Sequence, residues 1–169
     1  MKSVGSFDSD ASTAEIMAKM AAKNVDSGLR LKQFDIGESG LSDKSADALA
    51  KLIELNTPIT NMSLTANREL TLKGWKKVAN ALAKNHIITT LSLDYNDLGD
   101  EGAEIIASSL EHNNTIRSLD LEGNKIGNAG GHAILNSLKY NHMLNDITLS
   151  PGNKIDKDLE NRIKASLTR

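Results

Sequence analysis

The sequence predicts an α/β solenoid, in which curved, right-handed strand–helix repeats form a parallel inner sheet covered by outer helices. The first observation is a gapless repeat: LSLDYNDLGDEGAEIIASSLEHNNTIRS begins at Leu91, and LDLEGNKIGNAGGHAILNSLKYNHMLND follows at Leu119. The second is that each copy joins an alternating apolar triplet to apolar residues at helical spacing. Such a short unit buries its apolar faces only against neighbouring units, so the repeats must stack.

Five repeats are recognisable, and each opens with a short strand. Their first residues are Phe34, Met62, Leu91, Leu119 and Ile147. In each repeat this residue and the one two positions later are apolar, with a polar residue between them, which is typical of a strand buried on one face. We therefore expect five parallel strands that begin within about two residues of these positions.

A polar turn follows each strand, and asparagine occupies the same place in four of the turns: Asn67, Asn96, Asn124 and Asn153. An asparagine amide both donates and accepts hydrogen bonds, so it can pair with the backbone groups of stacked turns. These four residues predict a buried asparagine ladder.

Apolar residues at helical spacing follow each turn, which predicts an amphipathic helix whose apolar face covers the sheet. Trp75 stands at the first inward position of its helix, which favours core packing over partner binding. Each helix is expected to end near an asparagine in the left-handed cap conformation. These asparagines are Asn56, Asn85, Asn113 and Asn141.

The two ends of the chain differ from the repeats. Residues 1–12 are rich in Ser and Asp and are expected to be disordered, whereas residues 13–33 are expected to form a cap helix over the first repeat. The helix after Ile155 keeps few apolar positions and predicts a C-terminal cap. Residues 13–169 are therefore expected to form one domain.

The pattern LxxLxLxxNxL with a helical second half resembles the leucine-rich repeat, and the repeat length resembles its ribonuclease-inhibitor-like subclass. The phrase LAKLIELNTPITNMSL also resembles the C-terminal domain of the tropomodulins. The first resemblance implies a scaffold for protein–protein interaction. The second implies binding to the end of an actin filament, which stays open as an alternative.

The amino-acid composition excludes some classes of partner and indicates the compartment of the protein. The chain has 20 Lys and Arg, 22 Asp and Glu and a formal net charge of -2, so it offers no basic field to nucleic acid or to a membrane surface. It has no Cys, which excludes disulfides and thiolate catalysis and fits a reducing compartment. Without an apolar stretch of membrane-spanning length, a cytoplasmic monomer is expected.

Catalytic and metal-binding patterns are missing from the sequence. The four His residues lack the spacing of a helical zinc site, so no metal and no cofactor is expected. A Gly-rich stretch, residues 127–133, lacks the Lys and Ser or Thr of a phosphate loop. Arg68 stands beside a single-residue insertion on the rim, where an exposed arginine could serve a GTPase activator. We expect a non-enzymatic protein, with that activator as the alternative.

The strand positions that face away from the helices supply the candidate binding site on the concave side of the solenoid. They are polar and mildly acidic and include one aromatic, which suits a protein partner with a basic patch. The candidate residues are Asp35, Glu38, Asp94, Tyr95, Asp120, Glu122 and Asp146. On the outer helices, charges of alternating sign are expected to pair between neighbours, in the column Asp47, Lys76, Glu104 and His132 and between Glu111 and Lys139.

Overall fold

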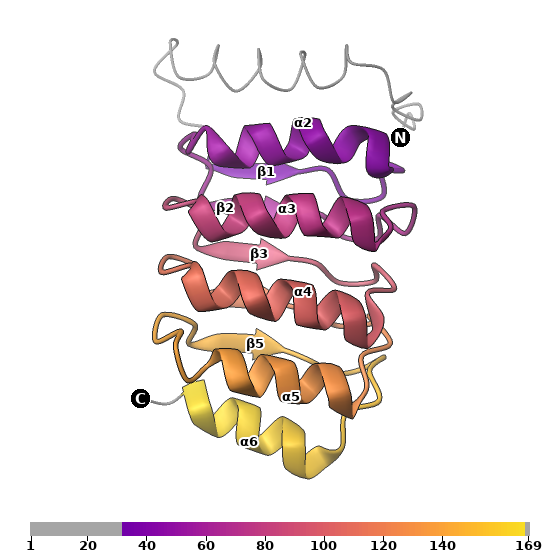
Figure 1. The fold of residues 1–169 in the computed structure, drawn as a ribbon, viewed down its shortest axis with the longest axis vertical. Coiled ribbons are helices and arrows are strands. Elements are labelled where there is room, and N and C mark those ends of the chain that lie inside the picture. The colour runs from indigo at the N-terminus through magenta and orange to yellow at the C-terminus, as the bar shows by residue number, and fades with distance from the viewer. Residues whose placement is uncertain (1–31, 168–169) are drawn as a thin grey trace.

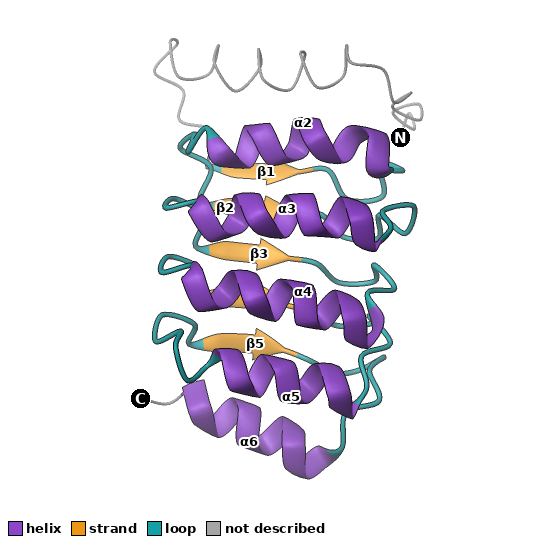
Figure 2. Ribbon diagram, in the orientation of Figure 1, coloured by secondary structure: helices purple, strands orange, loops and turns teal. Residues whose placement is uncertain are grey.

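The computed structural model describes residues 32–167, which form two layers, a sheet and a row of helices (Figure 1). Strands and helices alternate along the chain, and every helix lies on the same side of the sheet (Figure 2). The elements are β1 Gln33–Asp35, α2 Asp43–Glu54, β2 Asn61–Ser63, α3 Leu72–Lys84, β3 Thr90–Ser92, α4 Gly99–His112, β4 Ser118–Asp120, α5 Asn128–Ser137, β5 Asp146–Thr148 and α6 Lys157–Leu167.

The five strands form one parallel sheet in the order β1-β2-β3-β4-β5. Their central residues are in register with one another and are the residues at which the repeats were expected to begin: Phe34, Met62, Leu91, Leu119 and Ile147. The predicted solenoid fold is therefore confirmed. The expected disordered segment 1–12 and nearly all of the expected cap helix 13–33 lie outside the described residues, and Gln33 belongs to β1.

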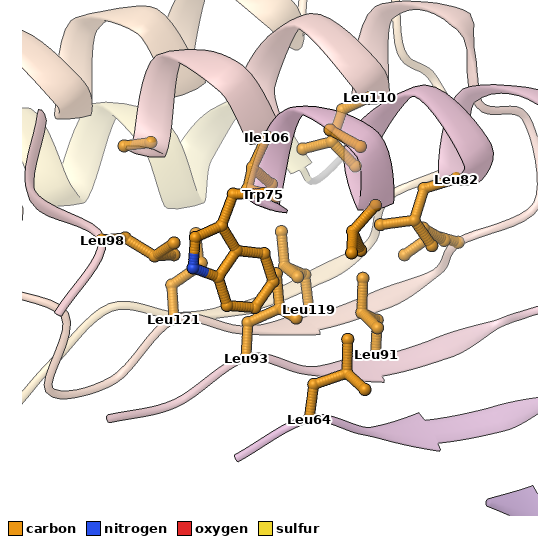
Figure 3. Close-up of a cluster of buried hydrophobic side chains, with 14 of the residues drawn as sticks. Leu64, Trp75, Leu82, Leu91, Leu93, Leu98, Ile106, Leu110, Leu119 and Leu121 are labelled. Atoms are coloured by element: carbon orange, nitrogen blue, oxygen red, sulfur yellow. The ribbon is translucent and has the colours of Figure 1, made fainter. Parts of the chain in front are cut away.

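The core between the two layers is almost entirely aliphatic, and Trp75 of α3 is its largest side chain. Trp75 is 1% exposed and packs among leucines that lie in or directly after β2, β3 and β4 and against Ile106 of α4 (Figure 3). The expected core role of Trp75 is confirmed. Within residues 32–167, its Nε1 is the one buried side-chain nitrogen or oxygen without a hydrogen-bond partner.

The turn asparagines join each repeat to the one before it. Asn124 Nδ2 donates to Leu93 O at 2.9 Å and to Leu121 O at 3.1 Å, and its Oδ1 accepts from the amide of Asn96 at 3.0 Å. Asn96 and Asn67 make the same kinds of bond one and two repeats earlier. Asn153 does so at the last repeat, accepting from the amides of Asn124 and Ile126.

A second asparagine ladder runs along the other edge of the molecule, where the helices end. Asn113 Nδ2 donates to Leu82 O at 2.7 Å and to Asn85 O at 3.1 Å, while its Oδ1 accepts from the amides of Thr115 and Ile116. Asn85 and Asn141 bond in the same way.

The expected left-handed conformation at the helix ends is wrong for three of the four asparagines, Asn85, Asn113 and Asn141. Asn85 and Asn113 have φ of -80° and -90° with extended ψ, and only Asn56 of this column has a positive φ, 49°. The physical reason is that an extended backbone lets the buried side chain reach across to the preceding repeat. Asn56 instead is exposed: its Nδ2 donates locally to Glu54 O, and its Oδ1 accepts from the amide of His86 in the following repeat.

The outer helices pair their charges differently from the expected column. Asp47 bonds to Lys77 at 2.6 Å rather than to Lys76, and Lys84 bonds to Glu54 at 3.0 Å. One residue along a helix turns the side chain by about 100°, so Lys77 points toward α2 while Lys76 does not. In the described part of the chain, Glu111 and Lys139 form no ion pair, which corrects the second expected pairing.

The last helix, α6, carries a buried carboxylate at Glu160. Its oxygens accept from Lys164 Nζ at 2.5 Å, from Lys157 Nζ at 3.2 Å and from Ser150 Oγ at 3.1 Å. The bond from Lys164, more than the others, holds the pKa of Glu160 at about 2, well below its ordinary value.

We expect the contribution of Glu160 to stability to depend on acidity. A carboxyl whose pKa is lower in the folded chain stabilises it above the unfolded pKa, and this stabilisation is lost as pH falls from about 4.5 to about 2. Because both lysines are partly exposed and screened, the effect should be about 2 kcal/mol. Urea unfolding of the natural chain and of Glu160→Gln across this range measures it. Equal pH profiles for the two chains would contradict the assignment.

Candidate protein-binding surface

The inner face is the side of the sheet that points away from the helices. It consists of three columns, with one residue from each repeat in every column. The columns are Gln33, Asn61, Thr90, Ser118 and Asp146; Asp35, Ser63, Ser92, Asp120 and Thr148; and Gly37, Thr65, Asp94, Glu122 and Ser150. The inner face is therefore polar in every repeat and contains no Lys or Arg.

Four of the acidic residues of the inner face, Asp94, Asp120, Glu122 and Asp146, lie in or directly after β3, β4 and β5. The pKa of the Asp120 carboxyl is raised, first by its partial burial and then by the negative charges of Asp94, Glu122 and Asp146, although the amide of Glu122 donates to it at 2.9 Å. A raised pKa means that this carboxylate is held in an environment that disfavours negative charge. A cation bound here would relieve that repulsion.

Hydrogen bonds from neighbouring strands orient two of these carboxylates. Asp94 Oδ1 accepts from Thr65 Oγ1 at 2.7 Å, and Asp146 Oδ2 accepts from Ser118 Oγ at 2.9 Å. Each carboxylate keeps oxygen lone pairs for a partner, because a carboxylate accepts about four hydrogen bonds. The cluster is therefore ordered before anything binds to it.

Tyr95 lies beside these carboxylates, in the turn that follows β3, and its own φ is 58°. The same turn position has a positive φ in Glu38, Ala66 and Gly123, so the chain leaves the sheet in the same direction in these repeats. The Tyr95 ring lies against Gly123, where a Cβ atom would stand 2.4 Å from the ring. Glycine in the next repeat therefore makes room for the tyrosine.

The Tyr95 hydroxyl donates to a carboxylate oxygen of Glu122. This bond, with the nearby charges of Asp94 and Asp120, raises the pKa of the Tyr95 hydroxyl, so it stays protonated and remains a donor. The ring is 40% exposed. An aromatic side chain fixed at its edge and open on one face is suited to contact with a cation or an apolar group.

Not all candidate residues lie together. Asp94, Tyr95, Asp120, Glu122 and Asp146 occupy adjoining repeats, and we call these five residues the acidic cluster. Asp35 and Glu38 belong to the first repeat and are separated from the acidic cluster by the second, whose strand carries no charge. Asp35 Oδ1 accepts from the amide of Gly37 at 2.9 Å, which turns it toward its own loop.

Arg68 lies on the rim next to the acidic cluster rather than projecting freely. Its Nε donates to the carbonyl oxygen of Tyr95 at 3.3 Å across the boundary between the second and third repeats. The bond uses one of the five N–H groups of the guanidinium and leaves the rest exposed. In residues 32–167, no group of three or more His, Asp or Glu side chains is arranged to hold a metal ion.

Comparison with known proteins identifies the repeat. Residues 84–107 and 112–135 match the family model described as leucine rich repeat. Over 76 residues the chain is 33% identical to leucine-rich repeat-containing protein 73 of Rattus norvegicus and, equally, of Homo sapiens. That alignment covers 43% of this chain and 24% of either relative, so the chain spans about a quarter of their length.

A solved structure of the leiomodin-1 actin-binding site 2 shares the fold. Its TM-score to this chain is 0.61 at 24% sequence identity, over 71% of this chain and 70% of that one. Together with the strand order and the outer helices, these findings show that the chain has the fold of a leucine-rich-repeat solenoid. Across residues 32–167, no helix is long and apolar enough to cross a membrane.

Proposed function

We propose that this leucine-rich-repeat chain is a non-enzymatic binding module whose acidic cluster captures a basic segment of a protein partner. The observation that carries the proposal is the group of carboxylates on adjoining repeats, two of which are oriented by hydrogen bonds from Thr65 and Ser118. The raised pKa of Asp120 is consistent with it. Lys or Arg side chains entering this surface would gain hydrogen bonds and reduce the repulsion among the carboxylates. The exposed ring of Tyr95 adds an aromatic contact at the edge.

The first repeat extends the proposed surface. Asp35 and Glu38 are exposed on the same face, and the neutral second repeat separates them from the acidic cluster. A partner that spans the sheet would therefore contact carboxylates at both ends and polar hydroxyl or amide groups in the middle. Such a distribution of charge fixes the register of a partner more than its affinity.

Replacing Asp94 and Asp120 by Lys should sharply weaken capture of the partner and slow its association, because opposite charge then repels the basic segment. Proteins retained from the native source by the natural chain are identified, produced separately and measured for binding to both chains. The fold should survive because both side chains point away from the core, and the lost bonds from Thr65 Oγ1 and the Glu122 amide should each cost about 1 kcal/mol.

The matched control lies on the opposite side of the molecule. Lys51→Glu on α2 also reverses an exposed charge and should leave binding to the same protein unchanged. If the Asp94→Lys, Asp120→Lys chain keeps full affinity, the partner binds outside the acidic cluster.

Binding should also weaken in acid. The pKa of Asp120 is raised in the free chain, so this carboxyl takes up a proton more readily than an ordinary Asp as the pH falls, and the protonated form attracts a cationic group less. An affinity measured at pH 7 should therefore exceed the affinity at pH 4, with a smaller difference in an Asp120→Asn chain. An identical pH dependence in both chains would rule out this role of Asp120.

A second candidate partner is actin, favoured by the likeness of the fold to the leiomodin-1 actin-binding site 2. Co-sedimentation with actin filaments and a filament-end elongation assay would test it directly. If actin binds, the Asp94→Lys, Asp120→Lys chain shows whether the acidic cluster makes the contact.

A further inference from the structure

A furrow runs along the outer surface between α3 and α4. It consists of three hollows of about 490, 510 and 370 Å³. Leu72 and Glu101 line both the first and the second hollow, and Lys76, Ile105 and Ser108 line both the second and the third. The furrow is therefore continuous from the rim beside Trp75 to the far ends of the two helices.

The two walls of the furrow carry opposite charges. α3 contains four Lys and no Asp or Glu, whereas α4 contains Asp100, Glu101, Glu104 and Glu111 and no Lys or Arg. Lys76 and Glu104 line the same hollow from opposite sides, and both are exposed. Among the residues that the structure describes, neither forms an ion pair, although Lys77 and Lys84 on the same helix pair with α2.

Small side chains form the floor of the furrow. Ala79 and Ala83 of α3 meet Ser108 and Ser109 of α4, with Ile105 beside them. Ser109 Oγ donates to Ile106 O at 2.7 Å within its own helix, so its hydroxyl hydrogen does not need an acceptor from a ligand. The floor therefore accepts apolar side chains from outside.

The rim end of the furrow differs from the neighbouring helix boundaries. Asp43 at the start of α2 accepts from the amide and the hydroxyl of Thr71, which precedes α3. Asp100, near the start of α4, accepts from the amides of Gly127 and Gly130 at the start of α5. The first residue of α3 is Leu72, which has no acceptor to offer the start of α4.

The unpartnered Nε1 of Trp75 belongs to the same end of the furrow. Trp75 and Leu98 both line the first hollow, and the nitrogen lies on the side of the ring nearest Leu98 (Figure 3). The rim end thus combines an uncapped helix start with a buried donor that lacks an acceptor. A ligand with free carbonyl oxygens would complement the uncapped amides at the start of α4.

We propose that this furrow binds an amphipathic helix from a protein partner, independently of the acidic cluster. The apolar stripe of the helix lies on the small-residue floor, its acidic flank faces Lys76 and its basic flank faces Glu104. Because the last carbonyls of a helix have no partner within it, the C-terminal end lies toward Trp75. The furrow follows helices of 13 and 14 residues, so it takes a partner helix of about 20 Å.

Three synthetic helical peptides with one shared apolar stripe provide the probe. The first carries Glu on one flank and Lys on the other, the second Glu on both flanks, and the third Lys on both. Fluorescence anisotropy should show the mixed peptide binding the natural chain at least threefold more tightly than the other two. Lys76→Glu should shift the preference to the all-Lys peptide, and Glu104→Lys should shift it to the all-Glu peptide.

The combined Lys76→Glu, Glu104→Lys chain has the two walls exchanged, so it should recover binding of a mixed peptide whose Glu and Lys flanks are also exchanged, with the C-terminal end still toward Trp75. Ser108→Trp fills the floor from an exposed position and should reduce binding of every peptide at least tenfold. The matched control is Lys51→Glu on α2 with Asp158→Lys on α6, an exposed charge exchange away from the furrow, which should change nothing. The Asp94→Lys, Asp120→Lys chain should also bind the mixed peptide normally.

The proposal is overturned if no peptide binds, if all three bind equally to the natural chain, or if Ser108→Trp leaves binding unchanged while circular dichroism shows a folded chain. Should Ser108→Trp fail to fold, the exchange of peptide preference by Lys76→Glu and Glu104→Lys decides the matter alone. Normal peptide binding together with a loss of partner capture by Asp94→Lys, Asp120→Lys would separate the furrow from the acidic cluster.

Discussion

Replacing Trp75 by alanine is expected to lower the free energy of unfolding by about 3–5 kcal/mol, the usual cost of removing a large buried aromatic side chain. Trp75 is 1% exposed and fills the space between α3, α4 and three strands (Figure 3). The surrounding leucines belong to different repeats and cannot close the cavity without separating from their own strands. Chemical denaturation of the purified chain measures the change.

The indole nitrogen allows a sharper comparison. Trp75→Phe keeps most of the buried ring and removes a donor that has no acceptor, so we expect it to cost far less than Trp75→Ala. Tyr140→Ala, at an aromatic that is 68% exposed, should stay within about 0.5 kcal/mol of the natural chain. Equal losses for Trp75→Phe and Trp75→Ala would mean that the nitrogen has a partner in solution.

Asn113→Leu is expected to cost about 4 kcal/mol although it adds apolar surface. The change leaves the carbonyls of Leu82 and Asn85 and the amides of Thr115 and Ile116 without their side-chain partner in a buried place. Each stranded polar group costs about 1–3 kcal/mol, less whatever water recovers. The melting temperature and the denaturant midpoint should both fall.

The neighbouring residue supplies a matched control. Asn114 is exposed, so Asn114→Leu makes the same chemical change one position along the chain with little effect on stability. Asn113→Asp keeps the hydrogen-bond acceptor and loses the donor. Its free energy of unfolding should lie between those of Asn113→Leu and Asn114→Leu. If Asn113→Leu and Asn114→Leu unfold at the same denaturant concentration, the second ladder does not stabilise the fold.

The strands and the stacking order could be predicted from the sequence because one alternation recurs with constant spacing around Phe34, Met62, Leu91, Leu119 and Ile147. The same recurrence was available for the asparagines at the helix ends, since Asn85, Asn113 and Asn141 are also one repeat apart. Their chemistry was misjudged because Asn is equally suited to a left-handed cap and to a bond between repeats. Only the backbone dihedral angles distinguish the two.

The details of the candidate surfaces depend on geometry that spacing does not contain. The outward direction of Asp94 and Asp120 follows from alternation along a strand, but the bond from Tyr95 to Glu122 depends on a positive φ at a tyrosine, which no residue preference predicts. The pairing of Asp47 with Lys77 instead of Lys76 depends on how α3 is rotated about its axis relative to α2. The furrow needs small residues on two helices to coincide, which a single repeat does not reveal.

The asparagine ladder in the turns also implies an order in which the repeats fold during synthesis. The amides of Asn96 and Leu98 bond to the side chain of Asn124, and those of Asn124 and Ile126 bond to Asn153, each time in the following repeat. During synthesis on a ribosome, a newly emerged turn therefore has no partner for its amides until the next repeat has left the exit tunnel. Each turn should therefore form its hydrogen bonds only after the next repeat has been synthesised. Chains stalled after successive repeats should show hydrogen-exchange protection of the amides in every turn except the most recent.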